Sequence, residues 1–228
     1  GVVGESGCGK STLGRTIIHL LESTEGKIIL NGEDITRVNK SKLKSVREKM
    51  QIVFQDPYSS LNPRMTVSET IREPLVLSGR FQKEEIEAKT KEIMDSVGLA
   101  ERLINSYPHE LDGGRRQRIG IARALALNPE FVVCDEPVSA LDVSIQAQIL
   151  NLMQDLQAEK NLTYMFITHD LSVVRFISDT ICVMYLGQLV ETCPSKELFR
   201  KPIHPYTKAL LSAIPSTDIH NRKQRILL

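Results

Sequence analysis

The segment Gly-Glu-Ser-Gly-Cys-Gly-Lys-Ser-Thr at residues 4–12 constrains the fold of this chain more than any other stretch. Its glycines, lysine and serine have the spacing of a loop that joins a buried strand to a helix. Such glycines let successive backbone N–H groups turn inward around an anion, and the helix that follows adds the positive end of its dipole. The segment predicts a phosphate-binding loop in an α/β fold, formed by Gly4, Glu5, Ser6, Gly7, Cys8, Gly9, Lys10, Ser11 and Thr12.

Lys10 and Ser11 give this loop the chemistry of a nucleoside triphosphate site. A lysine at this position neutralises the β- and γ-phosphates, and the serine hydroxyl that follows binds Mg²⁺. The alternative is an ordinary glycine-rich turn. Because the complete pattern lies between a strand end at Val2 and Val3 and a helical run, we favour the nucleotide with Mg²⁺.

Apolar runs typical of buried strands alternate along the chain with runs whose apolar residues recur at helical spacing. Strands are predicted at residues 27–30, 50–54, 131–134, 163–168 and 181–186, and helices at 11–21, 66–77, 83–97, 115–127 and 143–158. A proline- and serine-rich stretch at 56–65 is predicted to be a loop. This alternation predicts a mainly parallel sheet covered by helices on both faces.

Polar residues stand at the ends of the predicted strands. Ligands of parallel sheets bind at the carboxyl ends of the strands, where the phosphate loop, Gln55, Asp135, Glu136 and His169 all fall. We expect Asp135 to bind Mg²⁺ through water and Glu136 to orient or deprotonate an attacking water, a group that phosphoryl transfer requires. His169 is a candidate contact of the γ-phosphate. Taken alone, each of these residues is equally typical of a strand end at the surface.

Two adjacent glycines, Gly113 and Gly114, open a basic amphipathic helix. Their N–H groups can receive an anion at the helix start. The simpler alternative is helix capping, with Asp112 as the N-cap residue. The arginines that follow also fit a solvated face or a nucleic-acid patch, but their run is short and isolated, so we expect no nucleic-acid partner.

With 228 residues, the chain is long enough for one large domain or for one domain with a subdomain. Its net charge of +1 gives no global field that attracts nucleic acid, and its four cysteines lack the spacing of a metal site or a disulfide framework. No apolar run approaches the roughly 18 residues that cross a bilayer. Because residue 1 is not methionine and only a strand end precedes the loop, we expect the N-terminal part to be missing.

Taken in order, these motifs resemble those of the ATP-binding subunits of ABC transporters over essentially the whole chain. In the terms of that family they are the Walker A loop at 4–11, the Q-loop Gln55, the signature at 111–115, Walker B at 131–135 with Glu136, the D-loop at 139–142 and the switch His169. The resemblance implies ATP hydrolysis coupled to transport, with Mg²⁺ as the metal. It implies catalysis by Glu136, His169, Gln55 and Lys10, and Mg²⁺ held by Ser11, Gln55 and Asp135.

The resemblance also implies a P-loop NTPase fold with a RecA-like, mainly parallel sheet and an inserted helical subdomain. Its parts are a core at residues 1–55 and 120–200, a helical subdomain at 56–119 and the start of a C-terminal extension at 201–228. Two such subunits form a head-to-tail dimer in this family. In that dimer the ATP on the partner's Walker A loop is contacted in trans by Asp112, Gly113, Gly114 and Asp142.

Three segments resemble more narrowly the ATPases of dipeptide and oligopeptide importers. They are residues 54–64, 137–144 and 204–211, the last reading His-Pro-Tyr-Thr-Lys-Ala-Leu-Leu. Import of di- or oligopeptides is implied, with nickel or another small solute as the alternative. The implied partners are a second ATPase subunit, identical or different, two transmembrane permease subunits and, indirectly, an extracytoplasmic substrate-binding protein. These partners imply a place at the cytoplasmic face of the cell membrane.

The sequence departs from the family in its signature. The usual form is Leu-Ser-Gly-Gly-Gln, whereas residues 111–115 read Leu-Asp-Gly-Gly-Arg. The serine hydroxyl donates to the γ-phosphate, which an ionised Asp112 cannot do. We therefore predict a weakened composite site, unless Asp112 faces away as an N-cap or pairs with an arginine. The adenine-stacking aromatic residue and the iron–sulfur cysteines of the subfamily lie outside this sequence, which we expect to be truncated at both ends.

Two functions of other kinds remain as alternatives. A non-transport ABC ATPase of DNA repair or translation usually carries two such domains or a long insertion, and this chain has one phosphate loop and no such insertion. A P-loop kinase for small molecules needs an acceptor pocket and a lid in place of the segment around Gly113 and Gly114. Hydrolysis of ATP without an acceptor distinguishes the ATPase from the kinase.

Overall fold

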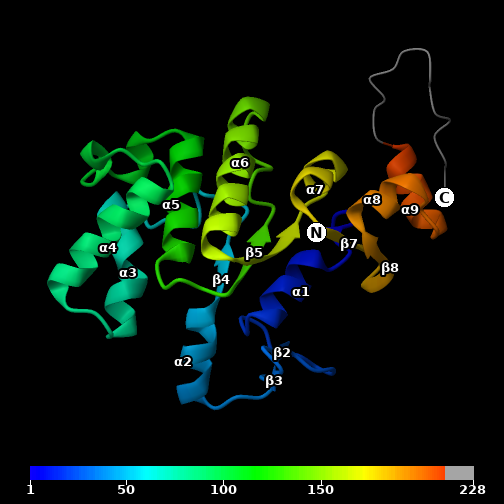
Figure 1. The fold of residues 1–228 in the computed structure, drawn as a ribbon, viewed down its shortest axis with the longest axis horizontal. Helices are drawn as coiled ribbons and strands as arrows, with labels where there is room; N and C mark the ends of the chain where they lie inside the picture. Colours follow the sequence, from blue (N-terminus) through cyan, green and yellow to red (C-terminus); the bar gives the residue numbers. More distant parts are fainter. Residues whose placement is uncertain (214–228) are drawn as a thin grey trace. The chain divides into compact units, whose positions relative to one another are not determined.

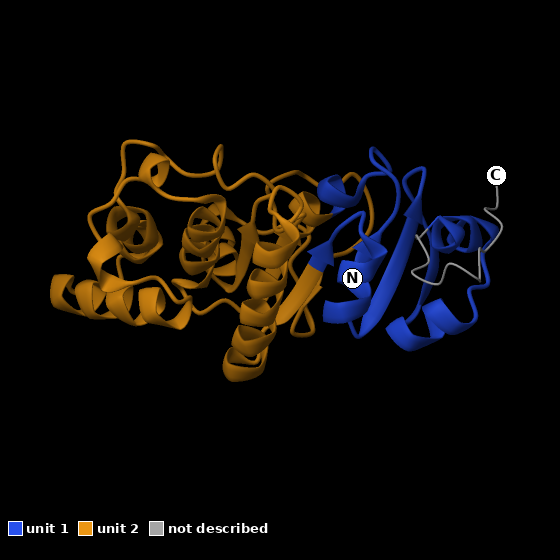
Figure 2. Ribbon diagram, turned by 90° about the horizontal axis from the view of Figure 1, so that it is seen from above, with its two compact units in different colours: residues 1–13, 166–228 blue, residues 14–165 orange. Residues whose placement is uncertain are grey.

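The computed structural model describes residues 1–213, and the chain forms two compact units (Figure 2). Unit 1 combines Gly1–Leu13 with the stretch that begins at Phe166, and unit 2 comprises Gly14–Met165. Within the described residues, no helix has both the length and the apolar character needed to cross a lipid bilayer. Each unit holds part of the predicted site, so the two are described in turn.

The sheet of unit 1 is built around β1 (Val2–Val3), which pairs in parallel with β6 (Thr163–Ile167) and β7 (Thr180–Tyr185). Strand β6 runs from unit 2 into unit 1 and meets β1 at its last residue. The antiparallel strand β8 (Gln188–Pro194) follows β7 after a two-residue turn whose φ angles are 47° and 80°. Two positive φ angles are the signature of the tight turn that suits the twist of a hairpin.

Helices α7 (Leu171–Ile177), α8 (Ser195–Arg200) and α9 (Pro205–Ser212) also belong to the described part of unit 1 (Figure 1). Apolar residues from these helices and from the strands share one buried cluster: Val3, Leu171, Val174, Ile181, Val183, Leu198 and Tyr206. Burial of such side chains is the main favourable contribution to folding. The cluster therefore fixes both the strand that leads into the phosphate loop and the C-terminal helix α9.

Unit 2 contains a second parallel pair, β4 (Met50–Val53) and β5 (Phe131–Asp135), aligned from Met50 opposite Phe131 to Val53 opposite Cys134. Apart from Gln51 and the terminal Asp135, both strands are apolar, as is typical of strands covered on two faces. The same unit holds helix α2 (Lys40–Lys49), helix α6 (Val143–Lys160) and the short hairpin of β2 (Ile29–Leu30) and β3 (Glu33–Asp34).

Helices α3 (Val67–Ser78), α4 (Lys83–Ser96) and α5 (Gly113–Leu125) pack together in unit 2, with the 3₁₀ turns Glu101–Leu103 and Pro108–Glu110 between α4 and α5 (Figure 1). Local signals explain where α3 begins and ends. Thr66 and Glu69 form a reciprocal capping box at its start, and Gly79 closes it with a φ of 71°. Such caps satisfy the backbone groups that a helix end leaves unpaired.

The predicted strands and helices are present, and the mixed α/β architecture with mainly parallel strand pairs is confirmed. The helix predicted at 11–21 is shorter, because α1 (Lys10–Ile17) ends before His19, which adopts a φ of 58°. Leu20 and Leu21, assigned to that helix from their spacing, are exposed. Helices α2, α7 and α8 and strands β3 and β8 were not predicted.

Candidate functional site

The phosphate loop follows β1 and depends on glycine for its path. Gly4, Gly7 and Gly9 have φ angles of 154°, 83° and 98°, which L-residues rarely adopt. At Gly4 a Cβ atom would lie 2.2 Å from the carbonyl oxygen of Met184, so no side chain fits there. A Cβ atom at Gly7 would have no neighbour within 4 Å, so at Gly7 the φ angle and not the available space favours glycine. A backbone with this succession of positive φ angles turns its N–H groups inward, as phosphate binding requires.

Lys10 is buried at the base of this loop, with an exposed fraction of 5%. Its ammonium group donates to the carbonyl oxygens of Gly4 at 2.8 Å and Glu5 at 2.9 Å. Buried cations are tolerated only where such partners compensate for lost hydration. The positive charge is therefore held against the loop, ready for an anion with stronger acceptors. Around it, Glu5, Ser6, Gly7 and Thr12 are exposed, Gly9 and Ser11 are partly buried, and Cys8 is buried.

His169 leaves the sheet at the same end as the phosphate loop. In the parallel pair of β1 and β6, Val2 lies opposite Ile167, and the N–H of Thr168 donates to the carbonyl of Val2 at 3.2 Å. The chain then exposes His169, as predicted for a strand-end residue. Its role as a γ-phosphate contact stays a prediction.

Gln55 and Glu136 are brought together at the ends of β4 and β5 in unit 2. The amide of Gln55 donates to a carboxylate oxygen of Glu136 at 3.1 Å. Glu136 adopts a φ of 48°, an uncommon conformation for a residue with a side chain and one that recurs at functional sites. Its carbonyl accepts from the N–H of Ser139 at 3.3 Å and from the hydroxyl of Ser139 at 3.1 Å. The turn therefore directs the carboxylate toward Gln55.

Asp135 is almost fully buried, with an exposed fraction of 1%, at the last position of β5. The guanidinium of Arg15 in α1 lies 3.4 Å from one of its carboxylate oxygens. An oxygen ligand of this kind suits Mg²⁺. Arg15 was not among the predicted site residues, and the sequence around it carries no signal that marks it as a partner of Asp135.

Asp112 caps helix α5. Its side chain accepts from the N–H of Arg115 at 2.8 Å, and its second oxygen lies 3.4 Å from the guanidinium Nε of Arg115. The two conditions under which Asp112 was expected to be tolerated, an N-cap geometry and an arginine partner, are both present. Asp142 has the same role in α6, where it accepts from the N–H of Ile145 at 3.0 Å.

The glycines of the signature segment allow close packing against the start of α6. A Cβ atom at Gly114 would lie 2.8 Å from Cγ2 of Ile145, and one at Gly113 would lie 3.1 Å from Cδ2 of Leu141. A larger residue at Gly114 would therefore push α5 away from α6. The anion-binding role of these two glycines stays a prediction, and their packing role is an additional reason for their identity.

The loop that follows Gln55 is attached to α5 by two arginines. The guanidinium of Arg116 stacks 4.7 Å from the centre of the Tyr58 ring, and Arg123 donates to the carbonyl of Ser60 at 2.8 Å. Cation–π contacts and charged hydrogen bonds of this kind are among the stronger polar interactions in proteins. These contacts connect the loop that follows Gln55 with helix α5, which begins in the signature segment.

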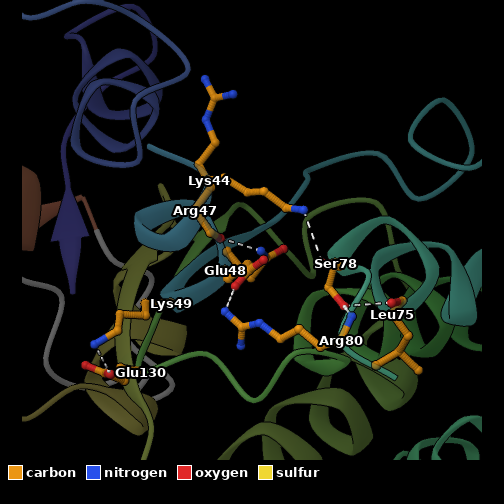
Figure 3. Close-up of polar contacts among 9 residues, drawn as sticks. Lys44, Arg47, Glu48, Lys49, Leu75, Ser78, Arg80 and Glu130 are labelled. Atoms are coloured by element: carbon orange, nitrogen blue, oxygen red, sulfur yellow. Dashed lines mark hydrogen bonds and ion pairs between the residues drawn. The ribbon is translucent and has the colours of Figure 1, made fainter. Parts of the chain in front are cut away.

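Unit 2 also has a groove of about 560 Å³ beside helix α2. Leu43, Pro74, Leu77 and Leu127 supply its apolar lining, and its charged residues are Lys40, Lys44, Arg47, Glu48 and Glu73. Polar contacts hold the helices that border it (Figure 3). Lys44 donates to the carbonyl of Ser78 at 3.1 Å, and Glu48 pairs with Arg80 just beyond α3. The groove is therefore preformed between α2 and the end of α3.

A family model described as ABC transporter matches residues 1–139, and one described as the C-terminal region of oligopeptide/dipeptide transporters matches residues 190–227. The oligopeptide transport ATP-binding protein OppF of Bacillus subtilis (strain 168) is 56% identical over 229 residues, covering 99% of this chain and 75% of that protein. OppF of Salmonella typhimurium is 53% identical over 219 residues, covering 96% of this chain and 66% of that protein.

Two solved structures have the same fold. The ATP-binding cassette MJ0796, a dimer in a post-hydrolysis state bound to ADP and Pi, gives a TM-score of 0.76 at 32% identity, covering 85% of this chain and 84% of that chain. CbiO1 of Clostridium perfringens, part of the ABC transporter complex cbiONQ, gives a TM-score of 0.80 at 28% identity, covering 88% and 78%. These likenesses confirm the predicted P-loop NTPase fold.

Proposed function

This chain belongs to the ABC transporter family of ATP-binding proteins, and on that premise we propose that it hydrolyses ATP to drive the uptake of di- or oligopeptides. The resemblance found in the sequence is thereby confirmed. One observation carries the peptide assignment: the C-terminal region at residues 190–227 matches the model of oligopeptide/dipeptide transporters, independently of the ATPase match at 1–139. Relatives above 50% identity are described as oligopeptide transport ATP-binding proteins.

The phosphate loop supplies the binding part of the mechanism. The backbone N–H groups of the loop beyond Glu5 would surround the phosphates, and Lys10 would exchange the carbonyls of Gly4 and Glu5 for β- and γ-phosphate oxygens. His169, at the end of β6, contacts the γ-phosphate. The exchange is favourable because the phosphate groups are ionised, whereas a carbonyl group is neutral and its oxygen is only a dipole end.

The ends of β4 and β5 supply the hydrolytic part. Glu136 accepts a proton from a water molecule as the water oxygen attacks the γ-phosphorus, releasing ADP and phosphate. The hydrogen bond from Gln55 at 3.1 Å orients this carboxylate. Ser11, Gln55 and Asp135 are the residues that would hold Mg²⁺, which would neutralise charge on the phosphate oxygens. Carboxylate, hydroxyl and amide oxygens are the donors that this hard cation prefers.

We further propose that the active form is a dimer with a second ATPase subunit, identical or different. In it the signature segment around Asp112, with Gly113 and Gly114, covers the ATP held by the partner, and Asp142 lies at the same interface. The contacts of α5 with Tyr58 and Ser60 support a path by which closure of the dimer reaches Gln55.

The groove beside α2 is the surface we assign to the transmembrane permease. Its apolar lining suits the apolar face of a short helix, and its charged residues of both signs suit polar side chains at the edge of that face. Two permease subunits would hold the ATPase pair at the cytoplasmic face of the membrane, with an extracytoplasmic protein delivering the peptide. The contacts of Lys44 with Ser78 and of Glu48 with Arg80 connect α2 with the end of α3 beside this groove.

The test uses the full-length subunit assembled with its permease partners in proteoliposomes, with release of phosphate and uptake of a labelled tripeptide measured together. We expect both to require Mg-ATP and to be lost in Glu136→Gln, while Glu159→Gln, an exposed carboxylate of α6, behaves as wild type. Uptake of nickel without peptide would favour the alternative substrate. Release of phosphate that is indifferent to the permease and to transported solute would contradict the proposal.

A further inference from the structure

We propose that Tyr206, in helix α9 of the C-terminal region, is a positioning residue of the phosphate loop. Its phenolic oxygen accepts a hydrogen bond of 2.9 Å from the backbone N–H of Glu5, although the two residues lie 201 positions apart. Both belong to unit 1. The inference rests on the nucleotide-binding function proposed above and deepens it, because it connects the C-terminal region to the binding of the phosphates.

The bond to Tyr206 controls the peptide group that Lys10 uses. The carbonyl of Gly4 and the N–H of Glu5 belong to one planar trans peptide, so they point in opposite directions. Lys10 donates to that carbonyl at 2.8 Å on one side, and Tyr206 accepts from that N–H at 2.9 Å on the other. Rotating the peptide would break both bonds. Tyr206 therefore determines where the first carbonyl of the loop, and with it the ammonium of Lys10, is held.

Tyr206 is itself rigidly placed. It has an exposed fraction of 6%, and its ring centre lies 4.4 Å from that of Tyr185. Burial raises the pKa of the Tyr206 hydroxyl, against the opposing effect of the bond from Glu5, so the group remains a neutral phenol. A rigid, neutral hydroxyl is a better fixed acceptor for an amide than a mobile side chain would be.

The residues around Tyr206 explain the motif His-Pro-Tyr physically. His204 caps α9 by accepting the N–H of Tyr206 at 3.2 Å on its Nδ1 atom, and Pro205 occupies the first helical position, where its missing N–H costs nothing. Glu191 of β8 accepts the N–H groups of Ile203 at 2.9 Å and His204 at 3.0 Å. The segment is therefore built to present Tyr206 to the loop.

A second contact from the same part of the chain reaches the loop. The N–H of Gly187, in the turn between β7 and β8, donates to the carbonyl of Cys8 at 3.1 Å. The loop is thus attached to residues near the C-terminus at both Glu5 and Cys8. Of the two contacts, only the one at Glu5 depends on a side chain, so it is the one that substitution can remove selectively.

The experiment compares Tyr206→Phe with Tyr185→Phe in the full-length subunit. Each variant loses one phenolic hydroxyl, and the two rings are neighbours, so the second is a matched control. We expect Tyr206→Phe to raise the Kd for ADP and for ATP by about three- to tenfold, the effect of one backbone hydrogen bond. We expect the Kd of Tyr185→Phe to stay within twofold of wild type and the melting temperatures of the two variants to agree.

Hydrogen exchange of the Glu5 amide in the nucleotide-free protein is the second measurement. The amide hydrogen of Glu5 should exchange several-fold faster in Tyr206→Phe than in Tyr185→Phe. Equal exchange, or equal nucleotide affinity, in the two variants would overturn the positioning role. If wild-type protein binds no nucleotide, the proposed function fails instead, and the exchange comparison still decides whether Tyr206 orders the loop.

Discussion

Replacing Asp112 by alanine and by serine separates the structural role of this residue from its electrostatic role. The Asp112 carboxylate caps α5 through the N–H of Arg115 and lies beside the Arg115 guanidinium. Alanine removes the cap and the charge, whereas serine removes the charge and keeps a capping oxygen. A difference in stability between the two variants therefore reports the helix cap. A change in activity that both variants share reports the loss of the negative charge.

The expected loss of stability follows from these contacts. Loss of an N-cap costs about 1 kcal/mol, and an ion pair between side chains that are 59% and 45% exposed adds less than about 1 kcal/mol. Asp112→Ala should therefore lower the free energy of unfolding by about 1–2 kcal/mol. For a chain of this length, that lowers the melting temperature by roughly 2–8 °C. Asp112→Ser should cost less than about 0.5 kcal/mol.

The expected effect on activity is small. In the assembled complex, Asp112→Ser should leave ATP hydrolysis within about twofold of wild type, because the Asp112 carboxylate already caps α5 and lies beside the Arg115 guanidinium, the two conditions under which it is expected to be tolerated. Differential scanning fluorimetry of the subunit and phosphate release by the complex measure the two effects. Equal melting of the alanine and serine variants would refute the capping argument. A rise of about threefold or more in Asp112→Ser would show that the carboxylate weakens the composite site in the proposed dimer despite these contacts.

Three further predictions test other contacts. Glu136 has a φ of 48°, which glycine adopts at little cost and alanine does not. In chemical denaturation, the free energy of unfolding of Glu136→Gly should therefore exceed that of Glu136→Ala by about 1 kcal/mol. Equal stability would show that the turn is unstrained. Arg123→Met should lower the free energy of unfolding by about 1–3 kcal/mol and speed hydrogen exchange around Ser60, whereas unchanged exchange would show that this loop has other anchors. Leu77→Glu, in the groove lining, should reduce co-purification of the permease without changing nucleotide affinity. The control is Val76→Glu, because Val76 is exposed next to Leu77 but does not line the groove, and it should leave co-purification unchanged. Equal losses in the two variants would refute docking of the permease in this groove.

The phosphate loop and the strand ends could be predicted because their signals are local. A buried strand followed by a polar residue is visible in a short window, as at Asp135, and the glycine spacing of the loop is fixed by backbone geometry. Their proximity within each unit follows from parallel pairing alone. The 3.1 Å hydrogen bond between Gln55 and Glu136 agrees with the expectation that the strand ends meet at one edge of the sheet.

Helix α2 shows what local patterns miss. Its ten residues include only two apolar ones, Leu43 and Val46, so no periodic face is visible in the sequence. The helix is instead started by Asn39, whose side chain accepts from the N–H of Lys42, and held by tertiary contacts such as that of Glu48 with Arg80. Helix propensity is a weak preference that such contacts override.

Partners that lie far apart in the sequence could not be predicted at all. Arg15 meets Asp135 across 120 positions, and Tyr206 meets Glu5 across 201. Nothing in a short window distinguishes Arg15 from an ordinary exposed arginine of an amphipathic helix. Such pairs depend on the register and packing of the whole unit, which become known only with coordinates.

Register explains why the candidate residues meet where they do. In unit 2, Val53 lies opposite Cys134, and Gln55 and Glu136 each follow two residues later. In unit 1, Val2 lies opposite Ile167, and the first glycine of the phosphate loop and His169 each follow two residues later. Equal offsets in a parallel pair bring both residues out at the same edge of the sheet. Inserting one residue after Val53 would shift Gln55 by about 3.3 Å and reverse its side, so its bond to Glu136 could not form.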